Sequence, residues 1–132
     1  MSMTDPIADM LVRIKNGLMR NAEKVVIPAS GLKTQILAIL KEKGYVKDVK
    51  TTVEDKKQSL HVYLKYTARG GKLINRLVRI SKPGRRVYRN AAKMGKILDG
   101  FGLAIISTHK GVMSDKECKK LKLGGEVLCE VW

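Results

Sequence analysis

The spacing of apolar residues changes several times along the first half of the chain, and these changes constrain the fold more than any other feature. Apolar residues recur every three or four positions across residues 7–18, which predicts an amphipathic helix. A β-branched stretch at 24–28 then predicts a short strand. Ser30 can cap a second helix, and two strands near 45–53 and 59–66 complete an α-β-α-β-β order.

The second half of the chain contains shorter strand-like stretches separated by glycine and proline turns. The expected elements are strands at 73–81, 86–88, 103–106 and 126–132, and short helices at 91–98 and at 114–121, the latter behind a capping box that starts at Ser114. The chain is therefore predicted to be α+β. It should consist of two small halves, an N-terminal α-β-α-β-β half at 1–66 and a strand-rich C-terminal half with short helices at 67–132.

A polar block, Ser-Thr-His-Lys-Gly at 107–111, follows directly after the strand predicted at 103–106, so we expect a loop there. Its residue types suit either a nucleophilic enzyme or a surface that holds a polyanion. A nucleophile paired with His109 would need a carboxylate to orient the imidazole. The nearest acid in sequence, Asp115, lies six residues further on, in the predicted capping box. This argues against a hydrolase.

Other catalytic and metal-binding patterns are incomplete. Gly70-Gly71-Lys72 lacks both the upstream glycine and the following hydroxyl of a phosphate-binding loop. His61 has no partners at metal-ligand spacing. Cys118 and Cys129 are not part of a paired motif, which indicates two ordinary reduced thiols. We therefore expect no enzyme activity, no metal and no cofactor.

Basic residues are concentrated in the second half of a chain whose net charge is +15. Residues 67–132 carry 15 Lys and Arg against 5 acids, whereas residues 1–66 carry 12 against 7. A merely soluble surface normally mixes both signs. The excess therefore favours a polyanionic partner, first nucleic acid and second an anionic membrane surface. No apolar run is long enough to span a membrane, and the N-terminus lacks the pattern of a signal peptide, so we expect a cytosolic protein.

The residue types of the polar block favour folded, partly paired RNA. Small hydroxyls suit the shallow minor groove of A-form RNA, glycine permits close approach of the backbone, and Lys110 can reach a phosphate. Aromatic residues are too few for a platform that stacks single strands; Tyr88 is the one aromatic in a basic segment. The alternative is a binder that uses charge alone, without preference for one nucleic acid or anionic surface.

Four segments, TDPIADMLVRIKNG, SKPGRRVY, GLAIISTHKGVMSDKE and GGEVLCEVW, resemble in order those of the bacterial small-subunit ribosomal protein S-eight family, and the resemblance covers the whole chain. It implies a structural constituent of the cytoplasmic ribosome that binds directly to an irregular stem in the central domain of small-subunit ribosomal RNA, early in assembly. It also implies contacts with neighbouring small-subunit proteins. In some bacteria, relatives repress translation of their own operon through an mRNA site that mimics the stem.

The resemblance also implies which residues contact RNA. The family loop corresponds to Ser107, Thr108, His109, Lys110 and Gly111, the basic turn and tyrosine to Lys82, Arg86 and Tyr88, and the Gly-Gly-Glu of the last strand to Gly124, Gly125 and Glu126. Secondary contacts fall near Thr4 and around Lys33. Two positions depart from the family pattern, since His109 stands where serine is usual and Gly31 stands where many relatives have lysine.

Overall fold

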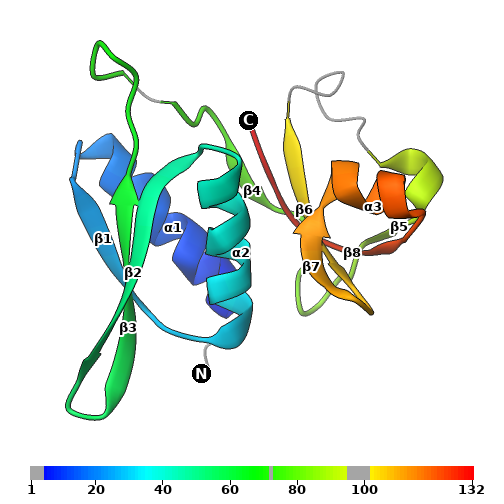
Figure 1. The fold of residues 1–132 in the computed structure, drawn as a ribbon, viewed down its shortest axis with the longest axis horizontal. Helices are drawn as coiled ribbons and strands as arrows, with labels where there is room; N and C mark the ends of the chain where they lie inside the picture. The colour runs from blue at the N-terminus through cyan, green and yellow to red at the C-terminus, as the bar shows by residue number, and fades with distance from the viewer. Residues whose placement is uncertain (1–4, 72, 95–101) are drawn as a thin grey trace. The chain divides into compact units, whose positions relative to one another are not determined.

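The computed structural model describes residues 5–71, 73–94 and 102–132 (Figure 1). The chain divides into two compact units, one comprising Ile7–Leu73 and the other joining Met1–Pro6 to Ile74–Trp132. The first unit therefore spans 7–73, whereas the predicted N-terminal half spans 1–66. The second unit includes residues 1–6 and begins again at 74, whereas the predicted C-terminal half begins at 67. Asp5 gives a physical reason at the N-terminus, because its carboxylate accepts a hydrogen bond from the guanidinium of Arg79 at 3.1 Å. Helices and antiparallel sheets together confirm the α+β prediction.

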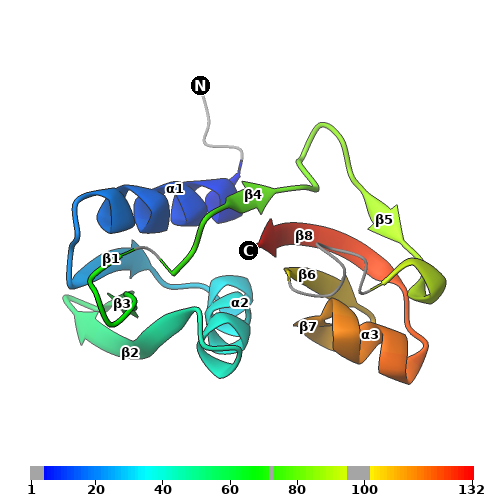
Figure 2. The ribbon, with the colours of Figure 1, turned by 90° about the horizontal axis from the view of Figure 1, so that it is seen from above.

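The first unit has the predicted α-β-α-β-β order. Its elements are α1 (Pro6–Met19), β1 (Lys24–Pro28), α2 (Gly31–Glu42), β2 (Val46–Glu54) and β3 (Lys57–Leu64). The three strands are antiparallel and lie in the order β1-β3-β2. In Figure 2, α1 and α2 lie beside this sheet and cover one of its faces. Along β1 and β3, buried apolar residues alternate with half-buried or exposed residues. The sheet therefore has one core face and one outer face.

The caps of α2 follow the sequence signals. The Ser30 hydroxyl accepts a hydrogen bond from the backbone N–H of Lys33 at 3.2 Å, which satisfies one of the otherwise unpaired donors at the helix start. Gly44, just beyond the end of the helix, adopts the left-handed conformation expected of it, with φ of +83°. The second helix therefore begins and ends where its sequence predicts.

The second unit is rich in short strands. Its elements are β4 (Leu77–Arg79), β5 (Tyr88–Arg89), the 3-10 helix η1 (Ala91–Lys93), β6 (Leu103–Thr108), β7 (Gly111–Ser114), α3 (Asp115–Leu121) and β8 (Gly125–Val131). Strand β8 is central, because it pairs antiparallel with β4, β5 and β6, and β7 extends the sheet from the far side of β6. The predicted α3 and β8 are confirmed, and the Ser114 hydroxyl caps α3 by accepting from Glu117 N–H.

Several predicted elements in this unit need correction. The strand expected at 73–81 is regular only over Leu77–Arg79, because the backbone before it bonds to the carbonyl of Trp132 instead. The strand expected at 86–88 begins only at Tyr88. The helix expected at 91–98 is a single 3-10 turn over Ala91–Lys93, and the rest of that stretch lies outside the described residues from 95 onward.

A compact apolar cluster lies under the sheet of the second unit. It consists of Met94, Ala104, Ile106, Met113, Cys118 and Val127, with Ile80 and Leu123 against it. Burial raises the pKa of the Cys118 thiol to about 11, with the Asp115 and Glu117 carboxylates adding to the shift. Burial likewise raises the pKa of Cys129 to about 12. Both thiols are therefore protonated near neutral pH and lie away from solvent.

Candidate nucleic-acid interface

The polar block at 107–111 forms the tip of a β-hairpin and not the continuous loop that the sequence suggested. Strand β6 extends through Thr108 and β7 starts at Gly111, which leaves only His109 and Lys110 as the connection. The prediction failed because it took polar side chains as a sign of loop. At the edge of the unit, a strand can carry such side chains on its exposed positions and still pair, as Ser107 does with Val112.

The Thr108 side chain fixes the shape of this tip. Its hydroxyl donates to the carbonyl of Gly111 at 2.8 Å and accepts from the backbone N–H of Lys110 at 3.1 Å. Gly111 has φ of +114°, a conformation that other residues rarely adopt. The tip therefore presents His109 and Lys110, both exposed, on a backbone held by local hydrogen bonds.

Strand pairing brings residues from three separate sequence motifs into one row. Glu126 in β8 lies directly opposite Ser107 in β6 on one side and opposite Tyr88 in β5 on the other. Directly opposed residues of antiparallel strands project from the same face of a sheet. The apolar cluster, with Val127 and Ile106, belongs to the other face. We call Tyr88, Glu126 and Ser107 the polar row.

Glu126 connects the polar row to the basic turn at 82–86. Its carboxylate accepts a hydrogen bond from the hydroxyl of Ser81, and it forms an ion pair with the Arg86 guanidinium at 3.1 Å. The Ser81 hydroxyl in turn accepts from the backbone N–H of Val87 at 3.1 Å. Ser81 is fully buried, so its hydrogen bonds cannot be replaced by water without rearrangement. This network positions Arg86 beside the polar row.

The basic turn itself is closed by backbone hydrogen bonds. Lys82 N–H donates to the carbonyl of Arg85 at 3.0 Å, and Arg85 N–H donates back to Lys82 at 2.9 Å. The side chains of Lys82 and Arg86 are exposed, and Tyr88 is 70% exposed although it is aromatic. An aromatic ring left in solvent beside cations is available to a ligand and contributes nothing to the core.

Gly125 allows the strands that carry the polar row to approach each other. A Cβ atom placed there would overlap the carbonyl oxygen of Ser107 and would lie 3.0 Å from the side chain of Ile106. A Cβ at Gly124 would lie 2.9 Å from the carbonyl oxygen of Arg89. The Gly-Gly pair therefore lets β8 pack closely against β5 and β6, and this close packing sets the position of the neighbouring Glu126.

The predicted secondary contacts are less well placed. Thr4 lies outside the described residues. Lys33 is only 6% exposed, and its ammonium donates to the carbonyl of Pro28 at 3.1 Å. An RNA contact by Lys33 would require that hydrogen bond to break, so this contact stays a prediction without a supporting geometry.

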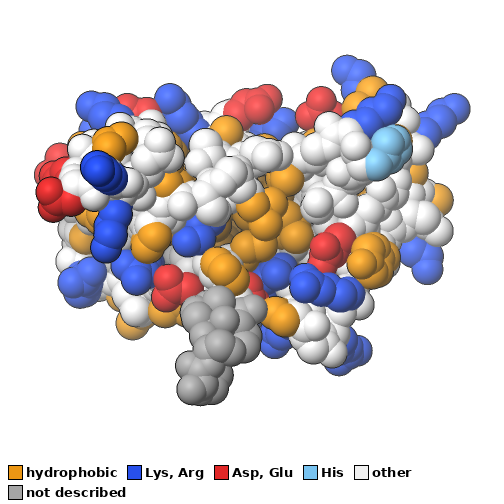
Figure 3. Space-filling view, turned by 90° about the horizontal axis from the view of Figure 1, so that it is seen from below, with side chains coloured by type: hydrophobic (Ala, Val, Ile, Leu, Met, Phe, Trp, Pro, Cys, Tyr) orange, Lys and Arg blue, Asp and Glu red, His pale blue; other side chains and the backbone are white. Residues whose placement is uncertain are grey.

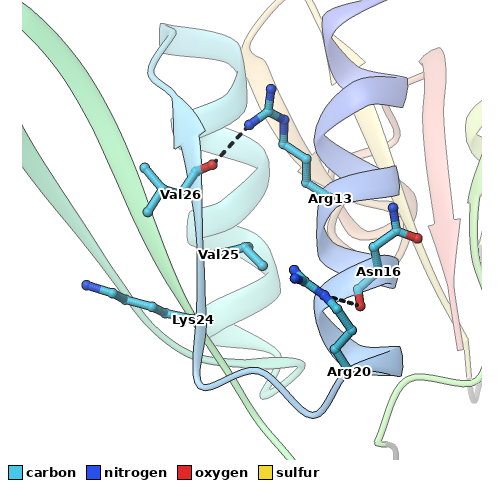
Figure 4. A pocket seen from close by; sticks show the side chains of 6 residues that line it. All are labelled: Arg13, Asn16, Arg20, Lys24, Val25 and Val26. Carbon is cyan, nitrogen blue, oxygen red and sulfur yellow. Dashed lines mark hydrogen bonds between the residues drawn. The ribbon is translucent and has the colours of Figure 1, made fainter.

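Sequence reasoning missed two features that bear on the surface. Ser81 was not singled out, although it directly precedes the basic turn in SKPGRRVY. A shallow pocket of about 280 Å³ in the first unit was also missed. Figure 4 shows that Arg13, Asn16 and Arg20 project from α1 beside β1, and the Arg13 guanidinium donates to the carbonyl of Val26 at 3.3 Å. The spacing of these three residues along a helix was the signal that could have indicated it.

Charge alone does not single out one binding surface. Figure 3 shows Lys and Arg side chains spread over the face in view, with acidic side chains among them in places. Within the part of the chain that the structure describes, no group of three or more His, Cys, Asp or Glu side chains is arranged to hold a metal ion. No helix of those same residues is long and apolar enough to cross a membrane.

Comparison with known proteins identifies the family. Residues 5–132 match the family model for Ribosomal protein S8. The chain is 49% identical to the Small ribosomal subunit protein uS8 of Halothermothrix orenii, 50% identical to that of Exiguobacterium sibiricum, and 48% identical to that of Staphylococcus aureus strain JH9, each over the full length of both chains.

The comparisons confirm the family that the four sequence segments indicated. They also confirm a non-enzymatic, RNA-binding constituent of the small ribosomal subunit, and with it a place in the cytoplasmic ribosome. The two departures at His109 and Gly31 do not disturb the match, which runs through both positions. The chain belongs to the ribosomal protein S8 family.

Proposed function

We propose that the protein is a primary binder of small-subunit ribosomal RNA, and that it recognises an irregular stem of the central domain through the polar row and the hairpin tip. The observation that carries this proposal is the convergence of Ser107, Glu126 and Tyr88 in one register row, although they come from three separate motifs. Arg86 and Lys110 flank that row with positive charge.

The surface suits the minor groove of A-form RNA in three ways. Ser107 is half-buried, and within the described residues no hydrogen bond of its hydroxyl is seen, so the group can donate to or accept from a sugar or base edge. The exposed Tyr88 ring can stack on an unpaired base. Lys110 can pair with a phosphate and set the register of the protein on the stem.

Thr108 has a different role in this proposal. Its hydroxyl already donates to Gly111 and accepts from Lys110, so it acts mainly by shaping the tip. The proposal therefore assigns sugar and base contacts to Ser107 and the positioning of the Lys110 backbone to Thr108.

The proposal includes two further roles that the family resemblance implies. A stem in the mRNA of the protein's own operon that presents the same groove would compete with the ribosomal RNA, and binding there would repress translation. Early binding to the central domain would also place neighbouring small-subunit proteins against this one as the platform of the subunit assembles. Competition between a labelled ribosomal stem and the operon mRNA tests the first of these roles.

A salt titration against the ribosomal stem and a regular duplex of equal length tests the main proposal. Wild-type protein should prefer the stem at every salt concentration. Lys110→Gln should weaken both RNAs and lower the salt slope by about 1, whereas Ser107→Ala should leave the slope unchanged and reduce the preference for the stem by roughly 1–3 kcal/mol.

Lys119→Gln, on the exposed side of α3, removes the same charge away from the polar row and serves as the control. Equal affinity of the wild type for both RNAs would contradict specific recognition. It would favour the alternative, binding by charge alone.

A further inference from the structure

The face of the three-stranded sheet that points away from α1 and α2 carries a second group of basic and aromatic residues. In the register of the sheet, Lys24 lies opposite Tyr63, and His61 lies opposite Lys50. Lys24 and Lys50 are exposed, whereas His61 and Tyr63 are half-buried. Figure 4 shows the Lys24 side chain extending away from α1. We call Lys24, Lys50, His61 and Tyr63 the outer sheet cluster.

Both ring nitrogens of His61 lie within hydrogen-bond distance of a neighbouring side chain. The Lys24 ammonium lies 3.1 Å from Nδ1 and has only hydrogens to give, so Nδ1 must be the acceptor. Nε2 of the same ring lies 3.0 Å from the hydroxyl of Thr52. His61 therefore holds the Lys24 ammonium in place without cancelling its charge.

The two lysines share one aromatic ring. The Lys24 ammonium lies 5.8 Å from the centre of the Tyr63 ring, and the Lys50 ammonium lies 5.3 Å from the same point. Each cation–π contact is favourable, but together they hold two like charges near each other on one small area. Such an arrangement is stabilised further by an anion placed between the ammonium groups.

The acid closest to this cluster in the register does not supply that anion. Asp48 lies opposite Tyr63, but its carboxylate accepts from the Lys41 ammonium at 2.9 Å and from the backbone N–H of Val49 at 2.8 Å. These hydrogen bonds lower the pKa of Asp48, with the one from Lys41 as the largest cause. The Asp48 carboxylate thus forms its ion pair with Lys41, and the Lys50 ammonium is only the smallest of the causes that lower the pKa of Asp48.

We propose that the outer sheet cluster is a second RNA-binding surface, which holds a phosphate of an RNA strand between Lys24 and Lys50. The inference rests on the proposed binding to ribosomal RNA and extends it to the first unit. Lys24 also lines the pocket formed with Arg13, Asn16 and Arg20, so donors continue from the cluster across β1. A row of donors suits successive phosphates of one strand better than the scattered carboxylates of an acidic protein.

The test compares two double variants that each remove two charges from the first unit. Lys24→Gln with Lys50→Gln removes the ammonium groups of the cluster. Lys15→Gln with Lys47→Gln removes two exposed lysines outside it. Affinity for full-length small-subunit ribosomal RNA is measured over a range of salt concentrations. The cluster variant should lower the salt slope by roughly 1.5–2, and the control should change it much less.

Two additional measurements keep the result interpretable. Lys24→Arg with Lys50→Arg preserves the charges and the cation–π contacts, so it should restore the slope if charge at these positions is what matters. Melting temperatures of all variants show whether a loss of affinity follows a loss of folding. A cluster variant that is folded and has the same slope as the control would overturn the proposal.

Poly-glutamate serves as a probe for an acidic protein in place of RNA. If the cluster variant loses binding to poly-glutamate but keeps the wild-type salt slope on RNA, the surface is a protein-binding site and the proposal is wrong. The proposed function fails separately, namely if the wild-type protein shows no preference for the ribosomal stem. If Arg86→Gln and Lys110→Gln weaken RNA binding but the cluster variant behaves like its control, the second RNA-binding surface is wrong and the proposed function still stands.

Discussion

The hairpin β2–β3 and the hairpin β6–β7 have connections of equal length but opposite construction. Asp55 and Lys56 join β2 to β3, and both adopt positive φ, of 50° and 65°. His109 and Lys110 join β6 to β7, and neither has positive φ; Gly111, the next residue, takes it instead. The first tip depends on backbone conformation, which its residue types adopt at a cost. The second is completed by the Thr108 hydroxyl.

This difference indicates that the β2–β3 tip serves only to reverse the chain, whereas the β6–β7 tip is built for recognition. Two residues at positive φ match the twist of the flanking strands and need no side-chain support. A tip that departs from this geometry needs extra hydrogen bonds, and Thr108 supplies them on both sides of Lys110. Such hydrogen bonds are useful where the backbone that carries a particular side chain must be held in one conformation, as the proposed phosphate contact of Lys110 requires.

The largest effect is expected where the second hairpin joins the rest of its sheet. Gly125→Ala would force a Cβ into the carbonyl oxygen of Ser107, and β6 and β8 must move apart. We expect the free energy of unfolding to fall by about 2 kcal/mol or more, because backbone, and not a flexible side chain, has to give way. Thermal unfolding measures this loss, and RNA affinity should fall with it.

Gly31→Ala is the matched control for that variant. Gly31 is the first residue of α2, and a Cβ there would meet no atom within 4 Å. Alanine has the higher helix propensity, so stability should stay equal or rise slightly. If Gly125→Ala were as stable as Gly31→Ala, the close approach of the two strands would not be what positions the polar row.

The first unit could be predicted almost completely from its sequence, because each element there has a local signal. The period of apolar residues identifies α1, Ser30 marks the start of α2, and the alternation around Leu60 identifies β3. The second unit lacks such signals at its short strands. Strand β7 has four residues, and β5 has two. Elements of this length are set by pairing with a neighbouring strand, β8 for β5 and β6 for β7, and not by their own sequence.

The candidate site was predictable as a set of residues but not as an arrangement. The resemblance supplied Ser107, Tyr88 and Glu126, yet only the register of β8 shows that they form one row. The hydrogen bonds of Ser81 and Thr108 were likewise invisible, since a hydroxyl in sequence does not reveal whether it faces a ligand or the local backbone. Lys33 shows the opposite error, because a lysine expected at the surface is buried against Pro28.

A medium effect is expected at the tip of the second hairpin. Thr108→Val keeps the shape of the side chain but removes both hydrogen bonds, so Lys110 N–H and the Gly111 carbonyl lose their partner. The free energy of unfolding should fall by about 1 kcal/mol. Affinity for the ribosomal stem should fall as well, because the Lys110 backbone is no longer held.

Thr34→Val provides the comparison for Thr108→Val. The Thr34 hydroxyl also donates to a backbone carbonyl, that of Ser30 at 2.8 Å, but it lies on α2 in the first unit. Thr34→Val should lower the free energy of unfolding by the same amount as Thr108→Val or by less, and it should leave RNA affinity at the wild-type value. A Thr108→Val variant that binds the stem as tightly as Thr34→Val would show that the tip needs no side-chain support for recognition.

The smallest effect is expected at the first hairpin, and there the sign is reversed. Asp55→Asn with Lys56→Gly introduces the pair that best tolerates positive φ at both positions of a two-residue connection. The variant should gain about 0.5–1 kcal/mol in the free energy of unfolding and melt roughly 2–4 °C higher. The same pair in the second hairpin, His109→Asn with Lys110→Gly, should give no such gain, because that tip places its positive φ at Gly111. It should also weaken RNA binding by removing the Lys110 charge. The variant of the first hairpin removes one carboxylate and one ammonium, so its net charge is unchanged and its RNA affinity should stay close to the wild-type value. Equal stabilisation of both hairpins by this pair would contradict the distinction between a chain reversal and a recognition element.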